Sequence, residues 1–188
     1  SFPTRRSSDL AEMGNMGYED FIFNAGYLND ESPIASWRGL ERKQELLKRF
    51  LEGKKELRFQ NKQGTDLRVN ISGMHWVNCC GTCNFPDGEV FSGPNLKAVD
   101  GGVNGVVRYA MPTIYRNVEV HNIELTFEKG AVVKASASKN EAFLKEMIAL
   151  DGGAKFVGEI AIGTNYRITK CTKNILFDEK IGGTFHLA

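Results

Sequence analysis

The sequence has no long apolar run and no excess of charge of either sign. Its 188 residues carry 24 basic and 23 acidic side chains, which gives a formal net charge of +1. A nearly neutral chain without a basic cluster is not typical of a nucleic-acid-binding protein. No segment approaches the roughly 18 consecutive apolar residues that a transmembrane helix needs. We therefore expect a protein that neither binds nucleic acid nor crosses a membrane.

Cysteine is also scarce, with four residues in the whole chain. Three of them, Cys79, Cys80 and Cys83, lie within five positions, and Cys171 is far away. This spacing does not suit a disulfide framework, and the first residues do not read as a signal peptide. We therefore expect a cytoplasmic protein with reduced cysteines.

The composition that remains is that of a globular protein, with 41% hydrophobic and 25% charged residues. The length fits one domain, or one domain and part of another. Residues 1–10 stand apart because they show no helical or strand period. One frame of a common sequencing-adapter DNA encodes residues 1–9, and its last two bases begin the codon of Leu10. We expect residues 1–10 to be an adapter-derived artefact, with a basic, disordered natural N-terminus as the alternative.

Residues 11–55 predict helices. Ser32 and Pro33 are typical of a helix start, and Gly53 is typical of a helix end. Between them, four apolar side chains recur at helical spacing and predict one buried face, namely Trp37, Leu40, Leu47 and Leu51.

Residues 56–188 predict a strand-rich domain. Alternating segments at 56–60 and 67–71 flank the turn 61–64 and indicate a hairpin, and residues 118–127 and 131–136 indicate a second one. Asn140 is positioned to cap a helix that runs through Leu150. The expected class is α+β, with a mixed sheet or partial barrel.

Three segments combine acids or a histidine with glycine and apolar residues, namely 84–91, 152–165 and 176–188. They contain Glu89, Glu159 and His186. An apolar surround makes an ionised carboxylate costly unless it is paired or bound to metal. The alternatives are a surface carboxylate for Glu89, a buried salt bridge for Glu159 and a core histidine for His186. Two carboxylates and one imidazole suit a divalent cation that acts as a Lewis acid.

These segments resemble the thermophilic-metalloprotease family, which includes aminopeptidases of the T, II and S types. The matching motifs are NFPDGEVF at 84–91, GEIAIGTN at 158–165 and LFDEKIGGTFHLA at 176–188. They occur in the family's order, and the similarity runs from residue 11 to residue 188. The resemblance implies that residues 11–55 are the helical end and linker of an N-terminal α/β domain. Residues 56–188 would then be a metallopeptidase catalytic domain.

The resemblance further implies that Glu89, Glu159 and His186 are ligands of a two-metal site, with Glu159 bridging the ions. The ions would be Zn, Co, Mn or Mg, and they would activate a hydroxide that hydrolyses the N-terminal peptide bond of peptides. Glu179 would be a general acid/base or outer-shell group. The intact protein would be a homodimer.

Two departures from the family pattern affect these expectations. Met74 stands where the family usually has a basic residue. The family pattern also continues, with a tyrosine and a His-x-Asp pair, beyond the point where this sequence ends at Ala188. We therefore expect the 188-residue chain alone to be inactive or nearly so.

Two other interpretations remain open. Cys80 and Cys83 could form a redox or zinc-binding module, although a structural zinc site needs four ligands and few are available. The chain could also be a non-catalytic relative that kept the fold and lost the chemistry.

Overall fold

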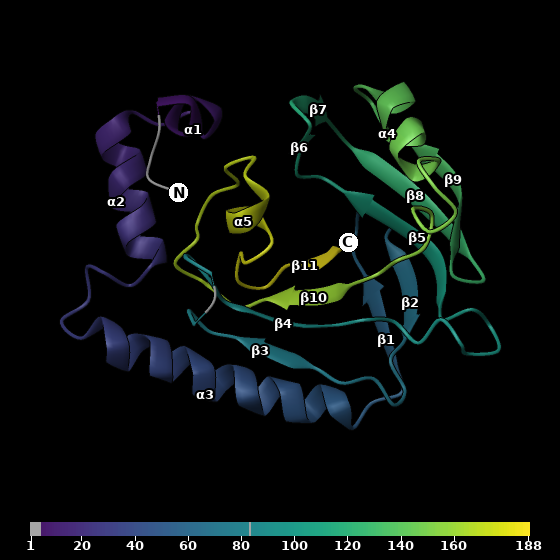
Figure 1. The fold of residues 1–188 in the computed structure, drawn as a ribbon, viewed down its shortest axis with the longest axis horizontal. Helices are drawn as coiled ribbons and strands as arrows, with labels where there is room; N and C mark the ends of the chain where they lie inside the picture. The colour runs from purple at the N-terminus through teal and green to yellow at the C-terminus, as the bar shows by residue number, and fades with distance from the viewer. Residues whose placement is uncertain (1–4, 83) are drawn as a thin grey trace. The chain divides into compact units, whose positions relative to one another are not determined.

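A computed structural model describes residues 5–82 and 84–188, and the chain divides into two compact units (Figure 1). Three segments form the first unit, namely 1–51, 76–91 and 161–186; the second unit comprises 52–75, 92–160 and 187–188. No helix among the described residues is both long enough and apolar enough to cross a membrane.

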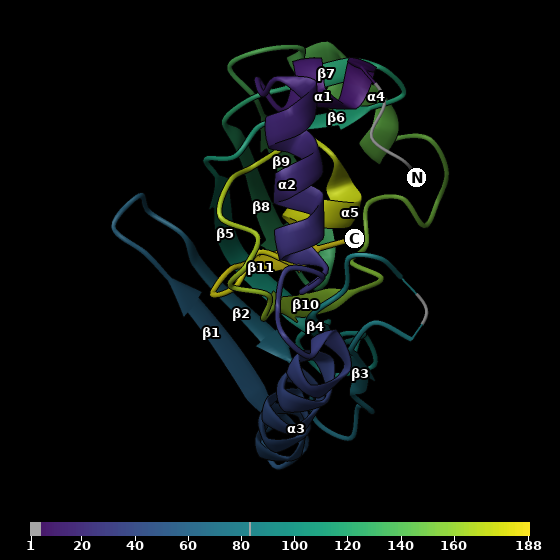
Figure 2. The same ribbon diagram turned by 90° about the vertical axis from the view of Figure 1, so that its left-hand side faces the viewer.

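Helix α1 (Arg5–Leu10) precedes α2 (Asn15–Ala25), and α2 contributes most of the core of the first unit together with α5 (Ile175–Asp178). The aromatic rings of α2 pack on Phe177 of α5, with 5.6 Å between the ring centroids of Phe21 and Phe177. Figures 1 and 2 both show α2 beside α5. The buried cluster consists of Ala11, Tyr18, Phe21, Ile22, Ala25, Ile168 and Phe177.

Residues 5–10 form helix α1, although their sequence has no apolar period that predicts one. Residues 1–4 of the segment expected to derive from an adapter lie outside the described residues. The adapter origin stays a prediction.

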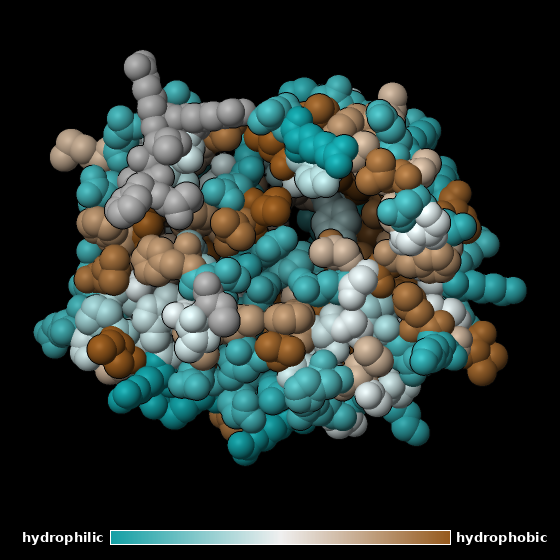
Figure 3. Space-filling model, in the orientation of Figure 1, coloured by the Kyte–Doolittle hydropathy of each residue, from teal (hydrophilic) through white to brown (hydrophobic). Residues whose placement is uncertain are grey.

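Helix α3 (Pro33–Glu52) begins and ends where the sequence predicts. Leu40 and Leu51 of the expected face are buried, while Trp37 and Leu47 are partly buried. Most of the exposed side chains along the lower edge of Figure 3 are hydrophilic, although Ile34, Leu46 and Phe50 of α3 are exposed as well. The unexpected member of the buried face is Gln44, which is 1% exposed. A buried amide requires hydrogen-bond partners, and these lie at the candidate site described below.

The first unit contains most of a four-stranded sheet in the order β11-β10-β4-β3. Its strands are β3 (Val77–Cys79), β4 (Glu89–Ser92), β10 (Ile160–Gly163) and β11 (Phe185–Leu187). Strands β3 and β4 are antiparallel, and their register places Cys79 opposite Glu89. Gly163, the last residue of β10, packs closely against the backbone of Ile181. A Cβ atom at position 163 would lie 2.2 Å from the carbonyl oxygen of Ile181.

The second unit contains a five-stranded antiparallel sheet in the order β1-β2-β5-β8-β9. Figure 2 shows β1 and β2 as a hairpin at the edge of this sheet. The remaining elements of the unit are the pair β6 and β7 and helix α4. The bounds are β1 (Glu56–Gln60), β2 (Asp66–Asn70), β5 (Val103–Tyr109), β6 (Thr113–Tyr115), β7 (Val118–Val120), β8 (Ile123–Glu128), β9 (Ala131–Ser136) and α4 (Glu141–Ile148).

Both predicted hairpins are confirmed, with differences in detail. The segment 118–127 is not one strand, because Asn122 adopts a left-handed conformation (φ 48°) between β7 and β8. Asn140 precedes α4 as expected, but its side chain does not cap the helix. It instead donates a hydrogen bond to the carbonyl oxygen of Glu119 (2.8 Å). A tertiary partner has replaced the local one.

The predicted α+β class is confirmed. The sheets are open and antiparallel, and the described strands do not form a closed barrel. The domain bounds expected from the sequence, 11–55 and 56–188, stay predictions.

Candidate metal centre

Glu89 is the first residue of β4, and its backbone is fixed by a side chain from α3. The amide nitrogen of Gln44 donates to the carbonyl oxygens of Cys79 (2.7 Å) and Glu89 (2.6 Å). One buried amide thus joins the helix to both members of a cross-strand pair. Glu89 itself is 6% exposed, so its carboxylate requires compensating partners.

The turn before Glu89 is held by the buried side chains of Asp87 and Asn165. The carboxylate of Asp87 accepts hydrogen bonds from the backbone N–H groups of Gly81 (2.8 Å) and Gly88 (2.9 Å). Gly88 has φ 125° and approaches Asn165 so closely that an added Cβ would lie 2.7 Å from the Cβ of Asn165. Glycine is therefore required there, because other residues rarely adopt this conformation and no room is left for a side chain.

Asn165, the last residue of the GEIAIGTN motif, connects this turn to the rest of the first unit. Its amide nitrogen donates to the carbonyl oxygens of Ala25 (2.9 Å) and Asp87 (2.8 Å). Its own backbone N–H donates to the carbonyl oxygen of Lys180 (3.0 Å). Asn165 is fully buried, so it acts as a structural junction between the segments on which Glu89 and Lys180 lie.

His186 lies in β11, and its Nε2 atom is 3.3 Å from Oε2 of Glu89. Both side chains are largely buried, with exposed fractions of 13% and 8%. The fold thus brings together the carboxylate of the NFPDGEVF motif and the imidazole of the third motif.

Lys180 completes this group and was not singled out by sequence reasoning. Its Nζ atom lies 3.1 Å from Oε1 of Glu89 and 3.4 Å from Oε2 of Glu179, and its side chain is 2% exposed. Burial alone would lower the pKa of Lys180, but attraction to Glu89 and then to Glu179 outweighs it and raises the pKa above its ordinary value. The sequence signal that could have identified it is a lysine between Glu179 and the apolar Ile181.

The two candidate catalytic acids lie in different units. Glu179 follows α5 directly, is half-buried and contacts Lys180. Glu159 belongs to the second unit and immediately precedes β10. Its backbone exchanges hydrogen bonds with Ala188, from Glu159 N to Ala188 O (2.8 Å) and from Ala188 N to Glu159 O (3.1 Å).

A second group of possible ligands consists of Cys79, Asp87 and Glu89, whose ligand atoms lie within 4.8 Å of one another. Both carboxylate oxygens of Asp87 already accept backbone hydrogen bonds, so this residue serves the turn. Of the proposed Cys80–Cys83 module, Cys83 lies outside the described residues. That interpretation stays a prediction.

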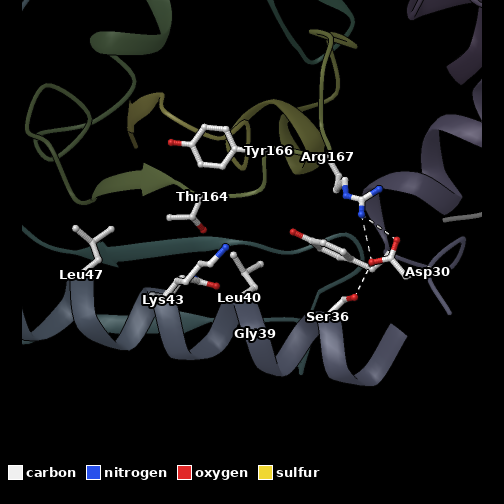
Figure 4. Close-up of a pocket in the computed structure, with 11 residues that line it drawn as sticks. Asp30, Ser36, Gly39, Leu40, Lys43, Leu47, Thr164, Tyr166 and Arg167 are labelled. Atoms are coloured by element: carbon white, nitrogen blue, oxygen red, sulfur yellow. Dashed lines mark hydrogen bonds and ion pairs between the residues drawn. The ribbon is translucent and has the colours of Figure 1, made fainter. Parts of the chain in front are cut away.

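A cavity of about 690 Å³ lies against the same part of the first unit (Figure 4). Arg167 in its wall is fully engaged, because it pairs with Asp30 (3.0 Å) and lies over the ring of Tyr27. Lys43 extends from α3 towards Thr164 (Figure 4). The cavity is lined by Tyr27, Asp30, Ser36, Gly39, Leu40, Lys43, Gln44, Leu47, Thr164, Tyr166 and Arg167.

The donor atoms of this centre fit a divalent cation. A buried carboxylate beside an imidazole offers one hard oxygen and one borderline nitrogen donor, a combination that zinc and related ions accept. The single positive charge of Lys180 faces the two carboxylates of Glu89 and Glu179, so a further positive charge is favourable there.

The chain is similar to known proteins along its whole length. The family described as thermophilic metalloprotease (M29) matches residues 1–188. Aminopeptidase AmpS of Bacillus subtilis (strain 168) is 32% identical over 166 residues, which cover 83% of this chain and 39% of that protein. Aminopeptidase T of Thermus aquaticus is 33% identical over 152 residues, which cover 75% of this chain and 36% of that protein.

Among solved structures, wild-type AmpT from Thermus thermophilus superposes with a TM-score of 0.74 at 28% identity. The match covers 90% of this chain and 44% of that one. This chain therefore spans about four-tenths of the length of the relatives it matches. By this match over all of its residues, the chain belongs to the thermophilic metalloprotease family M29.

Proposed function

We propose that this chain is part of a metal-dependent aminopeptidase that hydrolyses the N-terminal peptide bond of peptides. The observation that carries the proposal is the buried Glu89 carboxylate 3.3 Å from the imidazole of His186, in a member of a metalloprotease family. The similar proteins of Bacillus subtilis and Thermus aquaticus are aminopeptidases by name.

Glu89, Glu159 and His186 would hold the metal, in a centre with two divalent ions. Zn, Co, Mn and Mg are all compatible with a carboxylate-rich donor set. When bound, such ions supply Lewis-acid polarisation of a carbonyl and lower the pKa of a water molecule. Support for Glu159 comes from its place directly before β10, the strand between β4 with Glu89 and β11 with His186.

The chain's own residues would position and move protons. Gln44 and Asn165 hold the backbone on either side of Glu89 and thereby fix its carboxylate. Glu179 is half-buried beside Lys180, where a carboxylate could accept a proton from a nucleophilic water and deliver it to the leaving amine. Peptides are the proposed substrates, and a homodimer is the proposed assembly of the intact protein.

Metal binding by the 188-residue chain tests the proposal directly. Equilibrium dialysis against Zn²⁺ or Co²⁺, followed by elemental analysis, gives the number of ions bound. Glu89→Gln, Glu159→Gln and His186→Ala should each weaken binding, by about tenfold or more. Lys139→Met should not, because it changes an exposed ion pair with Glu119 in the second unit.

The stoichiometry decides between one ion and two. Unchanged affinity in all three ligand variants would contradict the proposed centre. Because the chain covers about four-tenths of its relatives, we propose that it binds metal without measurable turnover of leucine p-nitroanilide. Turnover that a chelator abolishes would show that this last proposal is wrong.

A further inference from the structure

Lys180 is unusual because a lysine is almost never fully buried unless it is paired. Its Nζ atom lies between two carboxylates from different segments, Oε1 of Glu89 at 3.1 Å and Oε2 of Glu179 at 3.4 Å. The contact with Glu89 connects the segment that follows α5 to β4, whereas the contact with Glu179 joins neighbours in the sequence. A lysine that paired only with its neighbour Glu179 could remain at the surface, whereas the side chain of Lys180 is only 2% exposed.

The contact also determines how Glu89 is presented. With Oε1 paired to Lys180, the other oxygen, Oε2, lies 3.3 Å from Nε2 of His186. Each carboxylate oxygen therefore has a different neighbour. The lysine occupies one side of the carboxylate and leaves the other side to the imidazole.

From this arrangement we propose that Lys180 is the built-in counter-cation of the metal centre. It neutralises Glu89 when no divalent ion is bound, and it holds Oε1 so that Oε2 faces His186. Lys180 is thus a positioning residue, and the inference rests on the proposed metal centre. Removing a partner from a buried ion pair leaves an uncompensated charge, which is strongly destabilising.

A neutral side chain at position 180 should therefore make folding depend on metal. In Lys180→Met, the buried Glu89 carboxylate has lost its nearest cation, and a divalent ion replaces the missing charge. The ammonium group also repels an incoming cation, so its loss should tighten Co²⁺ binding by about tenfold or more. A lysine that only fills space would leave the effect of metal on stability unchanged.

The experiment compares thermal unfolding of the wild-type chain and Lys180→Met, each with and without Co²⁺, and follows binding by the visible absorption of the ion. Lys139→Met is the matched control at an exposed ion pair. We expect a lower melting temperature for metal-free Lys180→Met and a larger rise on addition of Co²⁺ than in the wild type. An equal rise in both proteins would overturn the proposal.

Further measurements distinguish a failure of the proposed role of Lys180 from a failure of the metal centre itself. If Lys180→Met does not fold without metal, the double variant Lys180→Met/Glu89→Gln should fold, because the uncompensated charge is gone. Failure of the double variant to fold would overturn the proposal and indicate a purely structural lysine. Absence of Co²⁺ binding in the wild type would refute the metal centre itself, and the role of Lys180 with it. Binding with no difference between the variants would refute only the role of Lys180.

Discussion

The side-chain amide of Asn165 lies 2.8 Å from the carbonyl oxygen of Asp87, two residues before Glu89. The same nitrogen reaches the carbonyl oxygen of Ala25 at 2.9 Å. A single amide therefore ties the end of α2 to the turn that presents the candidate ligand. Both carbonyl groups accept a hydrogen bond from this buried amide.

Asn165→Asp tests this junction with almost no change of shape. The substitution replaces the donating nitrogen by an oxygen that faces two carbonyl oxygens. We expect a loss of about 2–5 kcal/mol in the free energy of unfolding, because two buried acceptors lose their donor. Urea denaturation measures it. Asn140→Asp, at an exposed amide, is the control and should change stability by less than about 1 kcal/mol.

Gln44→Leu should uncouple α3 from the strand pair that carries Glu89. The leucine preserves the buried volume but removes both hydrogen bonds, to Cys79 and Glu89. We expect a loss of about 2–4 kcal/mol, measured by chemical denaturation. Gln60→Leu, at an exposed strand position, provides the comparison. Equal effects of the two substitutions would show that the hydrogen bonds of Gln44 are not important.

Asp178 should make stability depend on pH. Burial raises the pKa of Asp178 above its ordinary value of 3.8, although hydrogen bonds from Thr172 and Cys171 oppose the shift. A raised pKa means that its contribution to stability is full below pH 3.8 and is lost as pH rises through the folded-state pKa.

Asp178→Asn removes this ionisation. The unfolding free energy of the variant minus that of the wild type should increase between about pH 4 and pH 7. The increase should be about 1.4 kcal/mol for each unit by which the pKa is raised. Urea titrations at a series of pH values measure it, and a difference that does not vary with pH would be inconsistent with a buried, titrating Asp178.

Cys171 should react slowly with alkylating reagents. Burial, and then contact with Asp178, raises the pKa of its thiol from 9.0 to about 11. At pH 8 the thiolate fraction in the folded protein should be about a hundredfold lower than in the unfolded chain. Iodoacetamide labelling with peptide mass spectrometry, in buffer and in urea, gives both rates. Equal rates under the two conditions would exclude a perturbed thiol.

Local signals in the sequence predicted much of the fold. The bounds of α3 followed from the sequence because helix start and stop signals affect only the adjacent turn of the helix. These signals are Ser32 and Pro33 at the start and Gly53 at the end. The turn 61–64 likewise set the first hairpin. Asn140 stands at the predicted N-cap position, but its side chain does not make the capping hydrogen bond, because its amide has a partner in Glu119 that no local pattern reveals.

The candidate site was predictable only in part. Chemistry alone gave only a hint of a metal site at Glu89, Glu159 and His186, and the resemblance to a family assigned the three residues to one centre. Lys180 and Gln44 were missed because their roles come from contacts with Glu89, a residue distant in sequence. A lysine or glutamine in an apolar segment reveals its partner only after the chain has folded.

The two hydrogen bonds of Asn165 span 140 and 78 residues of chain. Closing loops of this length costs conformational entropy before the contacts compensate for it, so such contacts form slowly. The hairpins of the second unit need no such closure. During synthesis on the ribosome, the first unit must wait for its last segment, 161–186, whereas β1 and β2 can pair long before. The residues around Glu89 therefore acquire their final arrangement only after segment 161–186 has been synthesised.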